Sequence, residues 1–248
     1  MKSVEPQLAR EWLQRWDAQQ ERYVAARESR FATIGHVLAA ALRDVADPLI
    51  LDLGCGPGSL SARMAGRLPA AEIVGVDVDP LLLALARGGY PDAARFVEAD
   101  LGVPGWSTLL GLSRKADAAM STTALHYLPP DVLAEVYLEL AGQLRPGGIF
   151  VNADNLYDEQ PTIAHLAAAV RQSSAAVHNE DWSSWWRAVE EEPALADLLA
   201  EREARPGHGG GDHHVPASVH ADLLRSAGFS EVGTVWQVGD DMILVAVR

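Results

Sequence analysis

The chain has 248 residues, of which 48% are hydrophobic, and a formal net charge of −14 at pH 7. This length suits one α/β domain with an insertion, and the acidic balance argues against a nucleic-acid partner, which would require a basic footprint, and against a membrane-surface role. Cys55 is the only cysteine, so no disulfide can form within the chain. No segment resembles a signal peptide or a membrane span, and we expect a cytoplasmic protein.

The first 45 residues are predicted to be helical. Large apolar side chains recur there at spacings that fit one apolar face, from Trp12 and Trp16 to Ile34 and Leu38. Arginines of the same segment, Arg27 among them, are interspersed with acids, and we expect most of them to lie on a solvated face.

A glycine-rich turn follows the first predicted strand. The apolar run of residues 48–53 predicts a buried strand, and a helix is predicted over residues 59–68. Between them, glycines occupy alternate positions after Asp52: Gly54, Gly56 and Gly58. Glycine lets the backbone turn tightly and lets a ligand approach closely. A dinucleotide fingerprint would need its third glycine at position 59, where the chain has Ser59.

Acids follow the next two predicted strands. The apolar run of residues 73–78 carries Asp77, which lies 19 residues after Gly58. In nucleotide-binding α/β sheets, an acid about 20 residues past the glycines accepts hydrogen bonds from the ribose hydroxyls. Residues 95–98 predict a third strand, and Asp100 follows it.

The rest of the chain alternates helices with further strands. A fourth strand is predicted over residues 116–120, a helix from Pro130, and a fifth strand over residues 149–153. Helices without strands are predicted next, over residues 163–170, 182–189 and 193–204. A helix and a hairpin of two strands are predicted last, over residues 218–227, 230–236 and 242–247.

The Asp-x-Gly-x-Gly-x-Gly motif that begins at Asp52, together with this order of strands and acids, resembles class I S-adenosylmethionine (SAM)-dependent methyltransferases. The resemblance implies an α/β Rossmann-like fold with a seven-stranded sheet that is completed by a C-terminal antiparallel hairpin. It divides the chain into an N-terminal helical lid, a SAM-binding half, a helical insertion that caps the substrate, and a C-terminal part: residues 1–45, 46–155, 156–214 and 215–248.

The same resemblance implies a cofactor site for SAM, with S-adenosylhomocysteine (SAH) as its product. SAM carries a sulfonium and an ammonium group but no phosphate, so its site needs acids rather than the lysine of a phosphate-binding loop, and no lysine follows the glycines here. Asp100 stands where the family places an acid against the adenine amino group. The implied cofactor-binding residues are Asp52, Gly54, Cys55, Gly56, Asp77, Val78, Asp100, Leu101 and Ser121.

The expected acceptor side is less defined. His126, after the fourth strand, either begins a helix or removes a proton from the acceptor as a general base. Clustered tryptophans at positions 182, 185 and 186 either pack in the core or form the wall of a substrate pocket. Candidate substrate-binding residues are Tyr23, Arg27, Asn155 and Trp186.

No metal is expected. The Asp154-Asn155 pair resembles part of the Mg²⁺ site of catechol-type methyltransferases, but Ser121 stands where those enzymes have a further carboxylate. A second possible ligand set for a transition metal consists of His208, Asp212, His213, His214 and His220, although the glycines beside it favour a flexible loop.

The sequence therefore predicts a methyltransferase that acts by direct displacement on an oxygen, nitrogen or carboxylate acceptor of a small molecule, as a monomer or homodimer. The alternatives are another SAM-using enzyme on the same fold (aminopropyl transfer, lyase or cyclase) and a non-catalytic SAM-binding protein. Neither nucleic acid nor a membrane is an expected partner.

Overall fold

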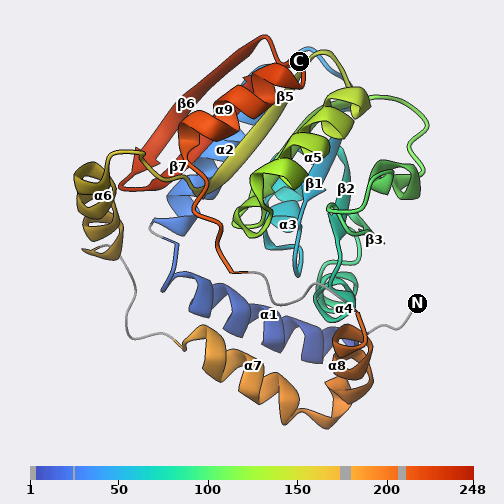
Figure 1. Cartoon of the computed structure of the whole chain (residues 1–248). Coiled ribbons are helices and arrows are strands. Elements are labelled where there is room, and N and C mark those ends of the chain that lie inside the picture. The colour runs from blue at the N-terminus through green and yellow to red at the C-terminus, as the bar shows by residue number, and fades with distance from the viewer. Residues whose placement is uncertain (1–3, 25, 174–179, 206–210) are drawn as a thin grey trace.

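Seven strands form one mixed sheet in a computed structural model of the protein, which describes residues 4–24, 26–173, 180–205 and 211–248. The strand order is β3-β2-β1-β4-β5-β7-β6, and β7 is antiparallel to both of its neighbours (Figure 1). The predicted sheet with its C-terminal antiparallel hairpin is confirmed. The strands are β1 (Leu49–Leu53), β2 (Glu72–Asp77), β3 (Arg95–Glu98), β4 (Ala116–Thr122), β5 (Leu144–Asn155), β6 (Glu231–Val238) and β7 (Asp241–Val247).

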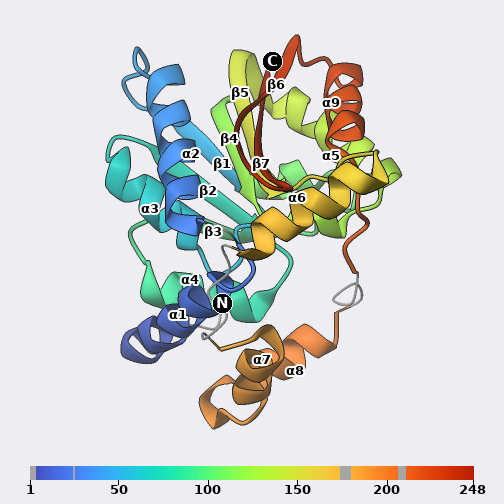
Figure 2. The same ribbon diagram turned by 90° about the vertical axis from the view of Figure 1, so that its left-hand side faces the viewer.

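Helices cover both faces of the sheet, and a further group lies across one of its ends (Figures 1 and 2). The helices are α1 (Pro6–Gln20), α2 (Arg27–Ala41), α3 (Ser59–Arg67), α4 (Pro80–Gly89), α5 (Pro130–Gln143), α6 (Pro161–Ser173), α7 (Trp182–Glu190), α8 (Ala196–Glu203) and α9 (Ala217–Ser226). Three short 3₁₀ turns are η1 (Trp106–Leu110), η2 (Leu125–Tyr127) and η3 (Pro193–Leu195).

Alternation along the strands builds a separate core on each face. Ile50 of β1 packs with Ile34 and Leu38 of α2 in one cluster, whereas Leu51 packs with Leu140 of α5 and Leu224 of α9 in the other. Successive side chains of a strand point to opposite faces of the sheet. Because helices cover both faces, every residue of β1 is buried, and neither face of this strand is exposed to solvent.

A third apolar cluster joins the helices at the end of the sheet. It contains Trp12 and Leu13 of α1, Leu85 of α4, Trp185 of α7 and Leu198 of α8. These helices lie below the sheet in both views (Figures 1 and 2). They form the wall that faces the carboxyl ends of β1 and β2, where the site lies. Within the described ranges, no helix has the length and hydrophobicity that crossing a membrane requires.

The N-terminal segment differs from the single helical lid that the sequence predicts. It consists of two helices, because the chain turns between Gln20 and Arg27, and Ala26 has a positive φ of 48°. α1 belongs to the helical group across the end of the sheet, whereas α2 packs on a face of the sheet through Ile34 and Leu38. Of the two helices, α1 is the one that belongs to the group facing the carboxyl ends of the strands, and the lid stays a prediction.

The helical insertion is also divided. Its first helix, α6, is attached to the β6–β7 turn, where the Nε atom of Arg171 donates to Asp240 at 2.6 Å and the α6 backbone approaches Gly239. α7 and α8 instead pack on α1 and α4. The sequence-based expectation that the whole insertion roofs the site is therefore wrong for α6.

Candidate active site

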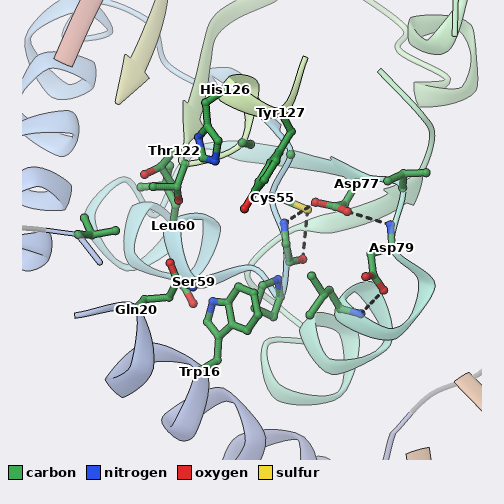
Figure 3. Close-up of a pocket in the computed structure, with 18 of the residues that line it drawn as sticks. Trp16, Gln20, Cys55, Ser59, Leu60, Asp77, Asp79, Thr122, His126 and Tyr127 are labelled. Atoms are coloured by element: carbon green, nitrogen blue, oxygen red, sulfur yellow. Dashed lines mark hydrogen bonds between the residues drawn. The ribbon is translucent and has the colours of Figure 1, made fainter. Parts of the chain in front are cut away.

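A cavity of about 720 Å³ opens at the carboxyl ends of β1, β2, β4 and β5. Its floor is the glycine turn after β1, and α1, α7 and α8 supply residues of the opposite wall. Figure 3 shows Trp16 and Gln20 of α1 together with Cys55 of the turn. A volume of this size is typical of small-molecule sites. All of the predicted site residues except Asp52 and Ser121 line it: Tyr23, Arg27, Gly54, Cys55, Gly56, Asp77, Val78, Asp100, Leu101, His126, Asn155 and Trp186.

The glycine turn has the backbone that the motif requires. Gly54, Gly56 and Gly58 have φ angles of 67°, 52° and 84°, in the region that favours glycine. A Cβ atom on Gly54 would lie 2.4 Å from the Cβ atom of Ala124, whereas one on Gly56 would meet no atom within 4 Å. Gly54 therefore permits close packing inside the protein, and Gly56 leaves an open face toward the cavity.

Asp77 lies at the end of β2 beside this open face. Its carboxylate accepts the backbone N–H of Gly56 at 2.8 Å and that of Asp79 at 2.9 Å (Figure 3). Loss of solvent raises the pKa of Asp77 to about 6 in spite of these bonds, which by themselves favour the charged form. The acid is thus fixed in orientation and ionised at neutral pH.

Two predicted cofactor residues do not reach the cavity. Asp52 is fully buried and accepts the Ser61 hydroxyl at 2.6 Å, and burial raises its pKa to about 7. The Ser121 hydroxyl, also fully buried, donates to the backbone carbonyl of Leu53 at 2.8 Å. Both side chains bond within the protein behind the glycine turn and the strand ends and do not line the cavity, so their contact with the cofactor stays a prediction.

The other cofactor candidates line the cavity from loops. Asp100 is exposed and accepts the backbone N–H of Gly102 at 2.8 Å, and Val78 and Leu101 supply apolar surface nearby. Burial raises the pKa of the Cys55 thiol well above its usual value, and Asp77 and Asp52 add to this shift. A thiol in that state is not a nucleophile.

His126 is held from behind by a buried acid, Asp154, for which the sequence predicted no such partner. Its Nδ1 atom lies 2.6 Å from Oδ1 of Asp154, which is itself fully buried, and its backbone N–H donates to Oδ2 of the same carboxylate at 3.2 Å. Burial by itself would lower the pKa of His126, but the Asp154 carboxylate outweighs it and the pKa is raised. Nε2 is the ring nitrogen left for a ligand.

Two arginines of the N-terminal segment, Arg27 and Arg30, are buried rather than solvated, whereas Arg10 is exposed. Arg27 is 6% exposed, donates to Asp17 at 2.8 Å, and keeps its Nη1 atom without a hydrogen-bond partner in the described structure. Asp17 also accepts the Ser59 hydroxyl at 2.7 Å, so it joins α1 to the start of α3. Arg27 was a predicted site residue; the network with Asp17 had no signal in the sequence.

The tryptophans of α7 fulfil both of the roles that the sequence left open. Trp185 is fully buried in the third cluster, whereas Trp182 and Trp186 line the cavity. The guanidinium of Arg202 lies 4.1 Å from the ring centroid of Trp186, and its Nε atom donates to Asp79 at 2.6 Å. Trp186 therefore lies beside Asp79, which follows β2, rather than at the end of the cavity that contains His126.

Of the possible metal ligands, Asp212 and His214 lie close together, with Oδ1 and Nδ1 3.6 Å apart, but the other described members have separate partners or lie elsewhere. His220 is buried, where its Nδ1 atom lies 2.6 Å from the hydroxyl of Tyr137, and Asp212 accepts from the Tyr157 hydroxyl. His208 lies outside the described residues. In the parts of the chain that the structure describes, no three His, Cys, Asp or Glu side chains are grouped as a metal site.

Comparison with known proteins places this site in a family. Residues 50–148 match the family described as a methyltransferase domain. A trans-aconitate 2-methyltransferase of Methylobacterium radiotolerans is 33% identical over 72% of this chain and 60% of its own length. The chain carries a class I SAM-dependent methyltransferase domain. A trans-aconitate 2-methyltransferase of Escherichia coli is 37% identical to it over 40% of this chain and 36% of the relative. The chain thus spans less than two thirds of the length of both relatives.

Solved structures share the fold of this methyltransferase domain. An amino pentose methyltransferase of Micromonospora echinaspora, solved with bound SAM, has a TM-score of 0.56 at 18% identity, covering 89% of this chain and 90% of that one. Magnesium protoporphyrin IX methyltransferase of Synechocystis, with bound SAH, has a TM-score of 0.54 at 18% identity, covering 90% of this chain and 83% of that one. At these identities the likeness concerns the fold.

Proposed function

We propose that the protein transfers a methyl group from SAM to a small molecule and that the acceptor atom is a carboxylate oxygen. One observation carries the proposal: a single cavity joins the glycine turn and Asp77 at one end to the buried His126–Asp154 pair at the other. The first end suits the cofactor, and the second offers a positive group to an anion. Relatives named for trans-aconitate, a carboxylic acid, support the choice of acceptor.

The residues of the cofactor end fit SAM. The open face of Gly56 leaves room for the ligand, and Asp77 has lone pairs left to accept from the ribose hydroxyls. Asp100 is proposed to accept from the adenine amino group. The buried Nη1 atom of Arg27 makes no hydrogen bond among the described residues and lies 4.0 Å from the carboxylate of Glu28. At the cavity wall it would suit a carboxylate such as that of the methionyl group.

When bound, SAM supplies a methyl group on a positively charged sulfur, which the acceptor displaces directly. A carboxylate acceptor has no proton to lose, so no general base is needed. The protein then has to hold the acceptor oxygen in line with the methyl group and to exclude water, and alignment of this kind can account for much of a rate enhancement. We assign His126, protonated on both nitrogens, to hold the carboxylate through Nε2–H.

The test is a pair of measurements on the intact protein. Calorimetry with SAH reports the cofactor site alone. Transfer of labelled methyl from SAM is then measured with trans-aconitate and other small di- and tricarboxylates, beside a phenol and a primary amine. We expect SAH binding and a product that releases methanol in base, as a methyl ester does. Methylation of the phenol or amine alone would overturn the carboxylate assignment, and absence of SAH binding would overturn the whole proposal.

A further inference from the structure

A buried arginine supports the cavity wall from behind. Arg30 of α2 is 1% exposed, and its Nη1 atom donates to Oδ1 of Asp241, which is fully buried, at 2.6 Å. Its Nη2 atom donates to the Thr122 hydroxyl oxygen at 2.9 Å. Thr122 is the last residue of β4 and lines the cavity, whereas Arg30 and Asp241 do not. One guanidinium therefore connects the start of β7 to a side chain that a ligand can touch.

This ion pair is not explained by stability. Removing two charges from water is expensive, and apolar residues of similar volume usually serve a core equally well. The pair is also incompletely satisfied, since Nε of Arg30 and Oδ2 of Asp241 have no hydrogen-bond partner among the described residues. The pair does hold a charged guanidinium in place, so that it donates a hydrogen bond to the hydroxyl oxygen of Thr122.

The turn that follows Thr122 is held in a strained conformation. Thr123 has a positive φ of 48°, which is rare for a β-branched residue, and its N–H donates to the carbonyl of Ala153 at 3.0 Å. Ala124 packs so closely over Gly54 that no Cβ atom fits there. The turn is thus fixed between the glycine turn and β5, which leaves Thr122 little freedom to move.

The bond from Arg30 also sets the polarity of the Thr122 hydroxyl. A hydroxyl has one donor hydrogen and two lone pairs, and here the guanidinium occupies a lone pair. The hydrogen is left over, and within the described residues it is donated to no protein atom. Figure 3 shows Thr122 next to His126 at the same end of the cavity. Two donors therefore face the space that the proposed function gives to the acceptor.

We propose that the Thr122 hydroxyl donates to an oxygen of the bound carboxylate acceptor, and that Arg30, paired with Asp241, is a positioning residue that orients this hydroxyl. The inference rests on the proposed function, because it concerns the same acceptor. It adds a second donor beside His126, so that the two fix which carboxylate oxygen faces the methyl group.

The experiment uses calorimetry of trans-aconitate and a panel of di- and tricarboxylates on the SAH complex, together with transfer kinetics. Thr122→Val should weaken acceptor binding and lower kcat/KM by about tenfold to a hundredfold, the usual loss when a buried hydrogen bond is removed, while SAH affinity stays unchanged. Thr122→Ser keeps the hydroxyl and should restore most of the loss. The double variant Arg30→Met with Asp241→Asn, which removes both charges, should lower acceptor affinity and kcat/KM to a similar extent. Adding Thr122→Val to this double variant should lower them little further.

Arg171→Met is the matched control, because Arg171 also binds a buried acid, Asp240, but lines no part of the cavity. We expect this variant to keep acceptor affinity. Unchanged acceptor binding in Thr122→Val, or equal losses of SAH and acceptor affinity with no rescue by serine, would overturn the inference. The inference would also be overturned if the natural protein bound SAH but none of the carboxylates in the panel. If the natural protein did not bind SAH at all, the proposed function itself would be overturned.

Discussion

The Nδ1 atom of His126 lies 2.6 Å from Oδ1 of Asp154, and the second oxygen of this carboxylate accepts the backbone N–H of the same histidine. Asp154 thus fixes the ring, its tautomer and its backbone together. The partnership favours the charged form of both groups: it raises the pKa of His126 against the effect of burial, and it lowers the pKa of Asp154 against the same effect. The pair therefore favours the protonated ring at the cavity wall.

The first prediction follows from the sign of this shift. If the imidazolium holds a carboxylate, kcat/KM for that acceptor is greatest below the raised pKa of His126 and falls by about tenfold per pH unit above it. A general base would give the opposite slope, since only the neutral ring can accept a proton. A pH series of initial rates with trans-aconitate distinguishes the two.

Variants of the pair sharpen this measurement. Asp154→Asn should move the falling limb to lower pH, because the histidine loses the carboxylate that raises its pKa. His126→Gln should flatten the profile and lower kcat/KM. His36→Gln, a change of an exposed histidine on α2, is the control and should keep the natural profile. A rate that rises with pH in the natural protein would show that His126 is a base.

Asp77 gives a prediction about the cofactor alone. Its pKa is raised to about 6, and the ionised carboxylate is the form that accepts ribose hydroxyls. SAH affinity should therefore be constant above that pH and weaken below it, by up to about tenfold per pH unit. Asp77→Asn should cost about 1–3 kcal/mol of binding free energy at pH 8 and remove the pH dependence. Calorimetry between pH 5 and 8 measures both, with the exposed Asp92→Asn as control.

Metal removal should leave activity unchanged. Both oxygens of Asp154 already accept hydrogen bonds, from the His126 ring and backbone and from the N–H of Asn155 at 2.9 Å. These bonds and the full burial of Asp154 disfavour a Mg²⁺ ion there. Transfer rates before and after EDTA treatment should agree within error, and a loss that Mg²⁺ restores would contradict this reading of Asp154.

The fold and the cavity residues around the glycine turn were predictable because their signals are local. Runs of apolar residues predicted the strands, and glycines at alternate positions predicted the turn. The length of a βα unit sets the spacing between these glycines and Asp77. Parallel strands have their carboxyl ends at the same edge of the sheet. The motifs that follow the first five strands, although far apart in the sequence, therefore lie around one cavity. No long-range contact had to be known.

The remaining errors concern side-chain direction and distant partners. Ser121 and Thr122 are neighbours at the end of β4, and successive residues of a strand point to opposite faces. The sequence does not indicate which of these two side chains points into the cavity. In the structure, Thr122 lines the cavity and Ser121 does not. Arg30 and Asp241 lie 211 positions apart, so the burial of that arginine could not be inferred from the charge pattern of its helix.

The last prediction concerns the cap formed by α7 and α8. Arg202 holds it to the body by donating to Asp79 at 2.6 Å, and the backbone N–H of Trp182 donates to the Tyr23 hydroxyl at 2.9 Å. Both bonds span the cavity wall, so the cap should loosen when one is removed. Arg202→Met should weaken SAH binding by about fivefold, the effect of roughly 1 kcal/mol from a partly exposed ion pair.

Hydrogen exchange measures the same loosening directly. In the natural protein, SAH should slow exchange in residues 6–20 and 182–203, because closing over a ligand orders both segments. In Arg202→Met, exchange in residues 182–203 should be faster without ligand and only partly slowed by SAH. Arg225→Met is the control, since Arg225 pairs with Asp222 within α9 and lines no part of the cavity. Equal behaviour of the two variants, or protection by SAH confined to residues 50–125, would mean that α7 and α8 are packing elements rather than a cap.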